Sequence, residues 1–189
     1  NQCVTLPGYG YEKNEIVICD FGFWSAGYSR NPCIPCGYGY TTAINGSSSP
    51  GDITLGASSQ DQCVLAPGVT PQPTGGIKPC PIGFYKALLG PSGCVACPPG
   101  TTTTAVSGAS ALSDCDACAP GFGNSAPIDP DALLCQICPS GTFAFGRVTS
   151  GPCRACPQDP AYTGRMVSRL VGSSGGCLRG DCSSFARLN

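Results

Sequence analysis

Residues 80–85 read Cys-Pro-Ile-Gly-Phe-Tyr, and this unit of a cysteine, two residues and a glycine recurs along the chain. An aromatic residue or a threonine usually follows the glycine. Repetition over so short a distance predicts a series of small, similar modules in place of one large core. Five further copies begin at Cys19, Cys36, Cys97, Cys118 and Cys138, and looser relatives begin at Cys3 and Cys63.

The units are also ordered at a longer period. Four cysteines recur in the same order three times, with Cys115 and Cys135 as additions. We therefore predict cysteine-rich super-repeats at residues 1–62, 63–117 and 118–157. Residues 158–189 lose the unit and carry four arginines, which predicts an atypical C-terminal cap or joining segment. The three sets are Cys3, Cys19, Cys33 and Cys36; Cys63, Cys80, Cys94 and Cys97; and Cys118, Cys138, Cys153 and Cys156.

The composition is typical of a secreted, disulfide-rich protein. The 189 residues include 16 Cys, 27 Gly and 19 Pro, with 11% charged residues and no His. Cysteine above about 8% marks extracellular scaffolds, which use bridges because they bury too little apolar surface to offset chain entropy. We expect an extracellular or cell-surface location. Because the chain begins at Asn1, we expect either a mature protein whose signal peptide is removed or an excerpt.

Charge and hydropathy argue against two classes of partner. The formal net charge is −1 and the ten Lys and Arg are scattered, so neither nucleic acid nor anionic lipid is an expected partner. The longest apolar stretches, such as Ile16–Ile18 and Ala87–Leu89, are far too short to span a bilayer. We therefore expect no membrane insertion.

The predicted fold class is small and disulfide-rich, mostly irregular with short β-hairpins, arranged as an elongated ladder of modules. In each unit the glycine permits a positive φ, and the aromatic and β-branched residues after it suit a short strand. A turn or two of helix is expected only at Pro127–Leu134 and Gly164–Val171. Residues Thr101–Thr104 and Asn45–Gly51 are predicted to be exposed loops.

Five Cys-x2-Cys pairs raise the alternative of zinc. Cys94/Cys97 followed by Cys115/Cys118 has the spacing of a zinc ribbon. Lone cysteines elsewhere have no role in such a ribbon, consecutive pairs compete for shared ligands, and no histidine is present. We therefore favour disulfides and predict no metal. The other pairs are Cys33/Cys36, Cys135/Cys138 and Cys153/Cys156.

Oxidised cysteines in these pairs predict a ladder of bridges. The two cysteines of a Cys-x2-Cys usually face opposite ways, one closing the preceding loop and one the following loop. Each closed loop of about 15 to 25 residues contributes roughly 3 kcal/mol, although sequence alone does not fix connectivity. The predicted bridges are Cys19–Cys33, Cys36–Cys63, Cys80–Cys94, Cys97–Cys115, Cys118–Cys135 and Cys138–Cys153.

Four cysteines remain outside this ladder as terminal or intermolecular candidates. One option pairs Cys156 with Cys177 and leaves Cys3 and Cys182 for other chains. Another closes Cys177–Cys182 and lets Cys156 reach Cys3 of a neighbouring copy. Both imply head-to-tail association into a homopolymer. In a third interpretation Cys3 pairs within its own chain, or the sequence is cut from a longer protein.

Two longer stretches resemble a known family. They are Cys80-Pro-Ile-Gly-Phe-Tyr running to Cys94-Val-Ala-Cys97-Pro-Pro-Gly, and Cys138-Pro-Ser-Gly-Thr-Phe running to Cys153-Arg-Ala-Cys156-Pro. They are similar to the cysteine-rich repeats of ephrin-receptor and tumour-necrosis-factor-receptor ectodomains, and to repeats of algal and protist surface proteins, including mastigoneme-like flagellar-hair glycoproteins. The resemblance covers roughly Cys3 to Pro157 and implies an elongated ladder of small β modules.

The sequence offers little material for catalysis. Without histidine, a general base near neutral pH has to be a carboxylate, and the eleven Asp and Glu show no paired spacing. Asp129 and Asp131 flank Pro130, an arrangement that fits a weak Ca²⁺ site but is more typical of a solvated turn. We expect no enzyme activity, no cofactor and no metal.

Two short motifs indicate modification or adhesion. Asn45-Gly46-Ser47 is an N-glycosylation sequon in the longest polar loop, so we expect a glycan at Asn45. Ser47–Ser49 and Thr101–Thr104 are candidates for O-linked sugars. Arg179, Gly180 and Asp181, framed by Cys177 and Cys182, resemble the cell-adhesion tripeptide held in a disulfide loop. An ordinary exposed turn is the alternative.

The aromatic side chains are expected to pack over neighbouring disulfides, which are the available small cores. A carbohydrate platform and contacts between copies are the alternatives. The rings are Tyr9, Tyr11, Phe21, Phe23, Trp24, Tyr38, Tyr40, Phe84, Tyr85, Phe122, Phe143 and Phe145.

The sequence supports two functional hypotheses. The first is a structural subunit of an extracellular glycoprotein fibre or surface appendage, which self-associates through its disulfide-stapled modules. The second is a ligand-binding receptor or adhesion ectodomain that presents one face of the ladder to a protein partner. Light scattering distinguishes them, because the subunit forms polymers whose size depends on concentration.

Overall fold

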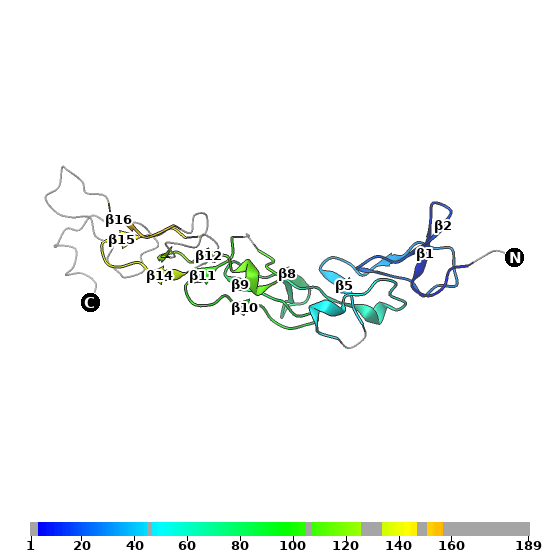
Figure 1. Ribbon diagram of the computed structural model, residues 1–189. Coiled ribbons are helices and arrows are strands. Elements are labelled where there is room, and N and C mark those ends of the chain that lie inside the picture. Colours follow the sequence, from blue (N-terminus) through cyan, green and yellow to red (C-terminus); the bar gives the residue numbers. More distant parts are fainter. Residues whose placement is uncertain (1–3, 45–46, 105–106, 126–133, 147–150, 157–189) are drawn as a thin grey trace. The chain divides into compact units, whose positions relative to one another are not determined.

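A computed structural model of the chain describes residues 4–44, 47–104, 107–125, 134–146 and 151–156. Within them, sixteen short strands pair as eight two-stranded hairpins. Several of these strands are labelled in Figure 1. The predicted fold class is confirmed as a small, disulfide-rich protein of short β-hairpins. The pairs are β1 (Tyr9–Glu12) with β2 (Glu15–Ile18), β3 (Phe23–Trp24) with β4 (Ile34–Pro35), β5 (Tyr40–Thr42) with β6 (Cys63–Leu65), β7 (Val69–Pro71) with β8 (Ile77–Pro79), β9 (Phe84–Tyr85) with β10 (Val95–Ala96), β11 (Thr101–Thr102) with β12 (Ala117–Cys118), β13 (Phe122–Asn124) with β14 (Cys135–Ile137), and β15 (Thr142–Phe143) with β16 (Arg154–Ala155).

The chain divides into two compact units. The first comprises Asn1–Pro81, Tyr85–Val95 and Ser107–Leu112, and the second comprises Ile82–Phe84, Ala96–Val106 and Ser113–Asn189. The division falls inside the predicted second super-repeat. The boundaries of the super-repeats therefore stay a prediction.

A backbone hydrogen bond recurs where each series of hairpins begins. The amide of Cys19 donates to the carbonyl of Gly8 at 2.9 Å, and the amide of Cys80 donates to that of Gly68 at 2.7 Å. Both glycines have left-handed φ, of 82° and 80°. A Cβ at Gly8 would lie 2.2 Å from the carbonyl oxygen of Gly56, so no other residue fits there without displacing backbone.

Small residues form the buried core. The buried side chains are mainly cysteine, alanine and threonine, with Leu65 and Leu89 the buried leucines among the described residues. None of the twelve aromatic residues expected over the disulfides is buried. Their packing over the disulfides therefore stays a prediction. A two-stranded hairpin has no second layer to cover a ring, whereas a disulfide and a methyl group fill the narrow space between neighbouring loops.

The segment at Thr101–Thr104 also differs from the predicted exposed loop. Thr101–Thr102 forms strand β11, and Thr102 and Thr103 are 5% and 1% exposed. The hydroxyl of Thr103 accepts a hydrogen bond from the amide of Gly83 at 3.2 Å. Thr42 does the same for Gly22, also at 3.2 Å. Threonine is buried at these places because the turn amide needs an acceptor.

Helix is limited to three single 3-10 turns among the described residues, η1 (Pro50–Asp52), η2 (Gln60–Gln62) and η3 (Leu112–Asp114). A capping box with Ser59 and Gln62 stabilises η2. Of the two expected helical segments, Gly164–Val171 lies outside the described residues, as does Pro127–Leu134 except for Leu134, which is not helical. No helix within the described ranges is long and apolar enough to cross a membrane.

Candidate interaction surface

Six disulfides tie the described hairpins together, and their pairings are those that the sequence predicts. Each links the end of one hairpin to the next, with Cα–Cα distances of 5.3 to 5.8 Å. The four cysteines with zinc-ribbon spacing belong to three different bridges, so they do not share a metal site. The bridges are Cys19–Cys33, Cys36–Cys63, Cys80–Cys94, Cys97–Cys115, Cys118–Cys135 and Cys138–Cys153.

Apolar side chains cover much of the surface that these bridges support. Tyr38 is 78% exposed, Tyr28 is 73% exposed and Phe145 is 64% exposed. Equivalent positions after the recurring Cys-x2-Gly turn are exposed in different repeats, such as Phe23 at 40% and Phe84 at 39%. Scattered apolar residues are normal on a monomer, but so many large ones on a chain with 11% charge are typical of a protein that binds a partner.

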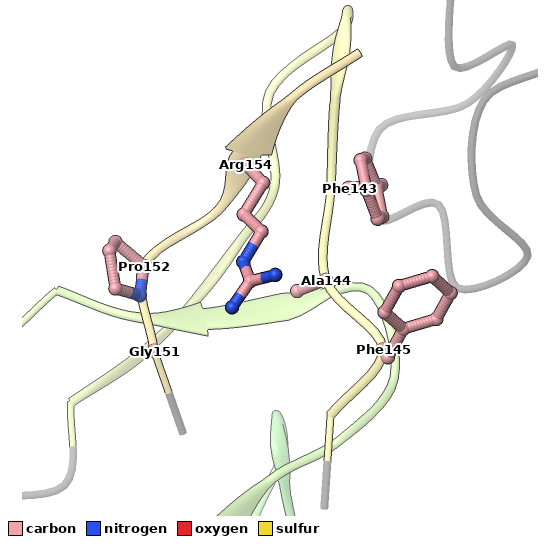
Figure 2. A pocket seen from close by; sticks show the side chains of 6 residues that line it. All are labelled: Phe143, Ala144, Phe145, Gly151, Pro152 and Arg154. Atoms are coloured by element: carbon pink, nitrogen blue, oxygen red, sulfur yellow. The ribbon is translucent and has the colours of Figure 1, made fainter. Parts of the chain in front are cut away.

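A small hollow lies beside the last described hairpin, β15–β16. Its volume is about 80 Å³, and its lining combines two rings with one cation. The rings of Phe143 and Phe145 meet edge to face with centroids 5.0 Å apart. Figure 2 shows the side chain of Arg154 running toward Ala144, between Pro152 and the two rings. The complete lining is Phe143, Ala144, Phe145, Gly151, Pro152 and Arg154.

Backbone contacts hold the floor of this hollow in place. The amide of Asn124 in β13 donates to the carbonyl of Gly151 at 3.0 Å. Gly123 packs so closely that a Cβ there would lie 2.5 Å from the amide nitrogen of Cys153 and 2.7 Å from its Sγ. The Cys138–Cys153 bridge then fixes the hairpin that carries Arg154. The hollow is therefore built on covalently fastened backbone.

Comparison of the repeats shows that the charge of the hollow is particular to this hairpin. Arg154 follows its cysteine directly, and the residues at the same place are Ile34 and Val95. In the register, Arg154 lies opposite Phe143 just as Ile34 lies opposite Trp24. The sequence analysis missed Arg154, although alignment of the pairs Cys33/Cys36, Cys94/Cys97 and Cys153/Cys156 contains the signal.

A buried lysine marks the corresponding hairpin of the preceding repeat. Lys86 is 1% exposed, and its Nζ donates a hydrogen bond to the carbonyl of Ala66 at 3.1 Å. Burial lowers the pKa of Lys86 from its ordinary value. Ser25 and Ala144 occupy the same place in the other repeats and are also buried. Lys86 thus joins two loops through its ammonium, at a place where the other repeats have a small buried side chain.

Several predicted sites lie outside the described residues. These include Cys3, Cys177 and Cys182, the glycosylation candidate Asn45, and Asp129 and Asp131. The adhesion candidates Arg179, Gly180 and Asp181 lie outside them as well. Cys156 is described and disulfide-bonded. Ser47 of the sequon is described, and its hydroxyl donates to the carboxylate of Asp52.

Residues 78–121 match the family model described as tyrosine-protein kinase ephrin type A/B receptor-like. The match spans β9 to β12 and the bridges Cys80–Cys94 and Cys97–Cys115. No curated protein matches the chain. The matched segment is an ephrin-receptor-like cysteine-rich repeat, and with the six disulfides it indicates an extracellular or cell-surface protein with modules of the ligand-binding or adhesion type.

Proposed function

We propose that the protein is a structural subunit of an extracellular glycoprotein fibre or surface appendage. It self-associates through its disulfide-stapled modules and has no catalytic activity. The observation that carries this proposal is the exposure of large apolar side chains from Val4 to Phe145, including Tyr38 at 78%. Burial of such surface between copies is favourable by about 25 cal/mol per Å².

The mechanism is mechanical. Each of the six bridges closes a loop of 14 to 27 residues in sequence separation, so each hairpin is held by its own neighbours. A pull on one module is resisted by covalent bonds and does not have to unfold a shared core. Glycans on the polar loops, Asn45 among them, keep the apolar contacts specific by covering the remaining surface.

The experiment follows the molar mass of the full chain by size-exclusion chromatography with light scattering across a hundredfold range of concentration. A mass that rises with concentration, and that falls to the monomer after reduction and alkylation, supports the subunit. A monomer at every concentration overturns it. Assemblies that survive full alkylation of all sixteen cysteines contradict the stapled mechanism.

The family match favours one alternative, a receptor or adhesion module that binds a protein ligand. A module of this kind stays monomeric alone and forms a one-to-one complex with its partner. The same chromatography therefore separates the two functions. Glycan occupancy is read in parallel by mass spectrometry of the peptide that contains Asn45 before and after enzymatic deglycosylation.

A further inference from the structure

The tip of the first hairpin carries two carboxylates side by side. Glu12 of β1 lies opposite Glu15 of β2, and both are exposed. Lys13 and Asn14 form the turn between them with φ of 49° and 66°. Like charges directly opposite one another destabilise a strand pair. Neither glutamate forms an ion pair with another residue that the structure describes, so the repulsion is not relieved within these ranges.

The same hairpin in the next repeat has no such feature. Its strands β7 and β8 are joined by a turn in which the amide of Gln72 donates to the carbonyl of Gly76 at 2.9 Å. The turn from Gln72 to Gly76 is uncharged. A neutral turn serves the fold equally well there. The hairpin fold therefore does not require acidic residues at its tip, and the two glutamates point to a contact with another surface.

The Arg154 hollow, in turn, has a positive charge that lacks a negative partner among the described residues. Arg154 is exposed, and it forms no hydrogen bond or ion pair with any residue in the described ranges. The hollow of about 80 Å³ is larger than a single water needs. It is far below the roughly 300 Å³ at which pockets for drug-sized ligands begin. The end of one acidic side chain suits a site of this size.

We propose that the Glu12–Glu15 tip of one copy docks into the Arg154 hollow of a second copy, a contact that rests on the proposed self-association. A carboxylate meets the guanidinium of Arg154, and the methylenes beside it pack on Phe143 and Phe145. The contact gives the two glutamates a cation, and it gives the arginine an anion against an apolar wall. Lys13 keeps its ammonium in solvent, as long side chains do at turns.

Such an interface joins two different surfaces, so it is heterologous. Repetition of a heterologous contact produces rings when the rotation closes and open filaments when it does not. Because the two surfaces are set on hairpins fixed by their own bridges, Cys19–Cys33 and Cys138–Cys153, neither has to rearrange on binding.

The test exchanges the charges. Arg154→Glu is made alone, Glu12→Lys with Glu15→Lys is made as a second variant, and all three changes are combined in a third. Lys78→Glu, an exposed cation in β8, is the matched control. Light scattering measures the concentration at half-association. Like charges facing each other cost several kcal/mol, so Arg154→Glu is expected to raise that concentration at least about tenfold, while the control leaves it within about twofold.

The combined variant and an equimolar mixture of the first two variants regain association, because each tip again finds a hollow of opposite charge. Three results overturn the proposal. If Arg154→Glu associates at the same concentration as the wild type, the hollow is not part of the interface, although the chain still self-associates. If the single-site and double variants lose association and the combined variant does not regain it, the Glu12–Glu15 tip is not the group that occupies the hollow. A wild-type chain that stays monomeric removes this contact and the proposed function together.

Discussion

In the first hairpin, Gly10 packs so closely against a disulfide that the stability cost of adding one methyl group there can be predicted. Gly10 of β1 lies against the Cys19–Cys33 bridge, and a Cβ there would sit 2.5 Å from the amide nitrogen of Cys33 and 2.7 Å from its Sγ. The neighbouring amide of Tyr11 donates to the carbonyl of Asn31 at 2.9 Å. Since the obstructing atoms are backbone and a bonded sulfur, neither can move aside without opening the hairpin.

Gly10→Ala is therefore expected to cost about 1 to 3 kcal/mol in the free energy of unfolding, as overpacking generally does. The loss is local, so the amide of Tyr11 should exchange with solvent roughly 5- to 150-fold faster, at 1.4 kcal/mol per factor of ten. Gly123→Ala should behave alike, because its Cβ would meet Cys153 at the same 2.5 and 2.7 Å. Urea unfolding with bridges intact, and amide exchange followed by mass spectrometry, measure both effects.

Gly93→Ala is the matched control. Gly93 precedes Cys94 in the second repeat, and a Cβ there meets no atom within 4 Å. This variant should equal the wild type or exceed its stability by a few tenths of a kcal/mol, through the loss of unfolded-chain entropy. Equal stability and equal amide exchange for Gly10→Ala and Gly93→Ala would refute the close contact between β1 and the bridge.

Three further predictions concern the interior. Lys86→Met removes a buried charge and should raise the stability of the fold near pH 7. In the wild type the pKa of Lys86 is lower in the folded state than in the unfolded state, so the stability of the wild type rises with pH from the folded pKa toward 10.5. Urea unfolding at several pH values should therefore show the stability difference between the variant and the wild type narrowing over that interval. Replacing Cys36 and Cys63 by serine opens a loop of sequence separation 27 and should cost about 3.5 kcal/mol in thermal unfolding. Thr70→Val removes the hydroxyl that donates to the carbonyl of Ser92 at 3.4 Å, and calorimetry should show a loss of about 1 kcal/mol or less.

The hairpin class and the bridges follow from the sequence because their signals are local. A glycine three residues after a cysteine specifies the turn, as at Gly22 and Gly83, with φ of 78° at both. Two cysteines separated by two residues face opposite ways on a strand end, so each closes a different loop. Cys33 and Cys36 do so, reaching back to Cys19 and forward to Cys63.

The position of the aromatic side chains does not follow in this way. A ring is expected inside when a second layer exists to cover it, and sequence does not say that these hairpins lack one. Phe21 is 51% exposed and Phe145 64% exposed as a result, while Ala57 and Ala117 are fully buried. Arg154 is also hard to recognise from the sequence alone, because its charge stands out only when it is compared with Ile34 in an equivalent register.

The repeats also compensate for internal changes, and this explains why they can differ outside. In the first and third repeats a strand glycine faces a proline before the cysteine, as Gly10 faces Pro32. In the second repeat the glycine's place is taken by Thr70, and the residue before Cys94 is Gly93 in place of proline.

The hydrogen bonds adjust to this difference in sequence. Tyr11 and Asn124 donate their amides to the carbonyls of Asn31 and Gly151, at 2.9 and 3.0 Å. The equivalent residue in the second repeat is Pro71, which has no amide to donate, and the hydroxyl of Thr70 bonds to the equivalent carbonyl instead. The carbonyl two residues before each of these cysteines thus accepts a hydrogen bond in all three repeats, although the donor differs. Arg154 and its equivalents Ile34 and Val95 are all exposed, so this position does not decide the fold. A repeated scaffold can therefore acquire two unlike surfaces without loss of fold.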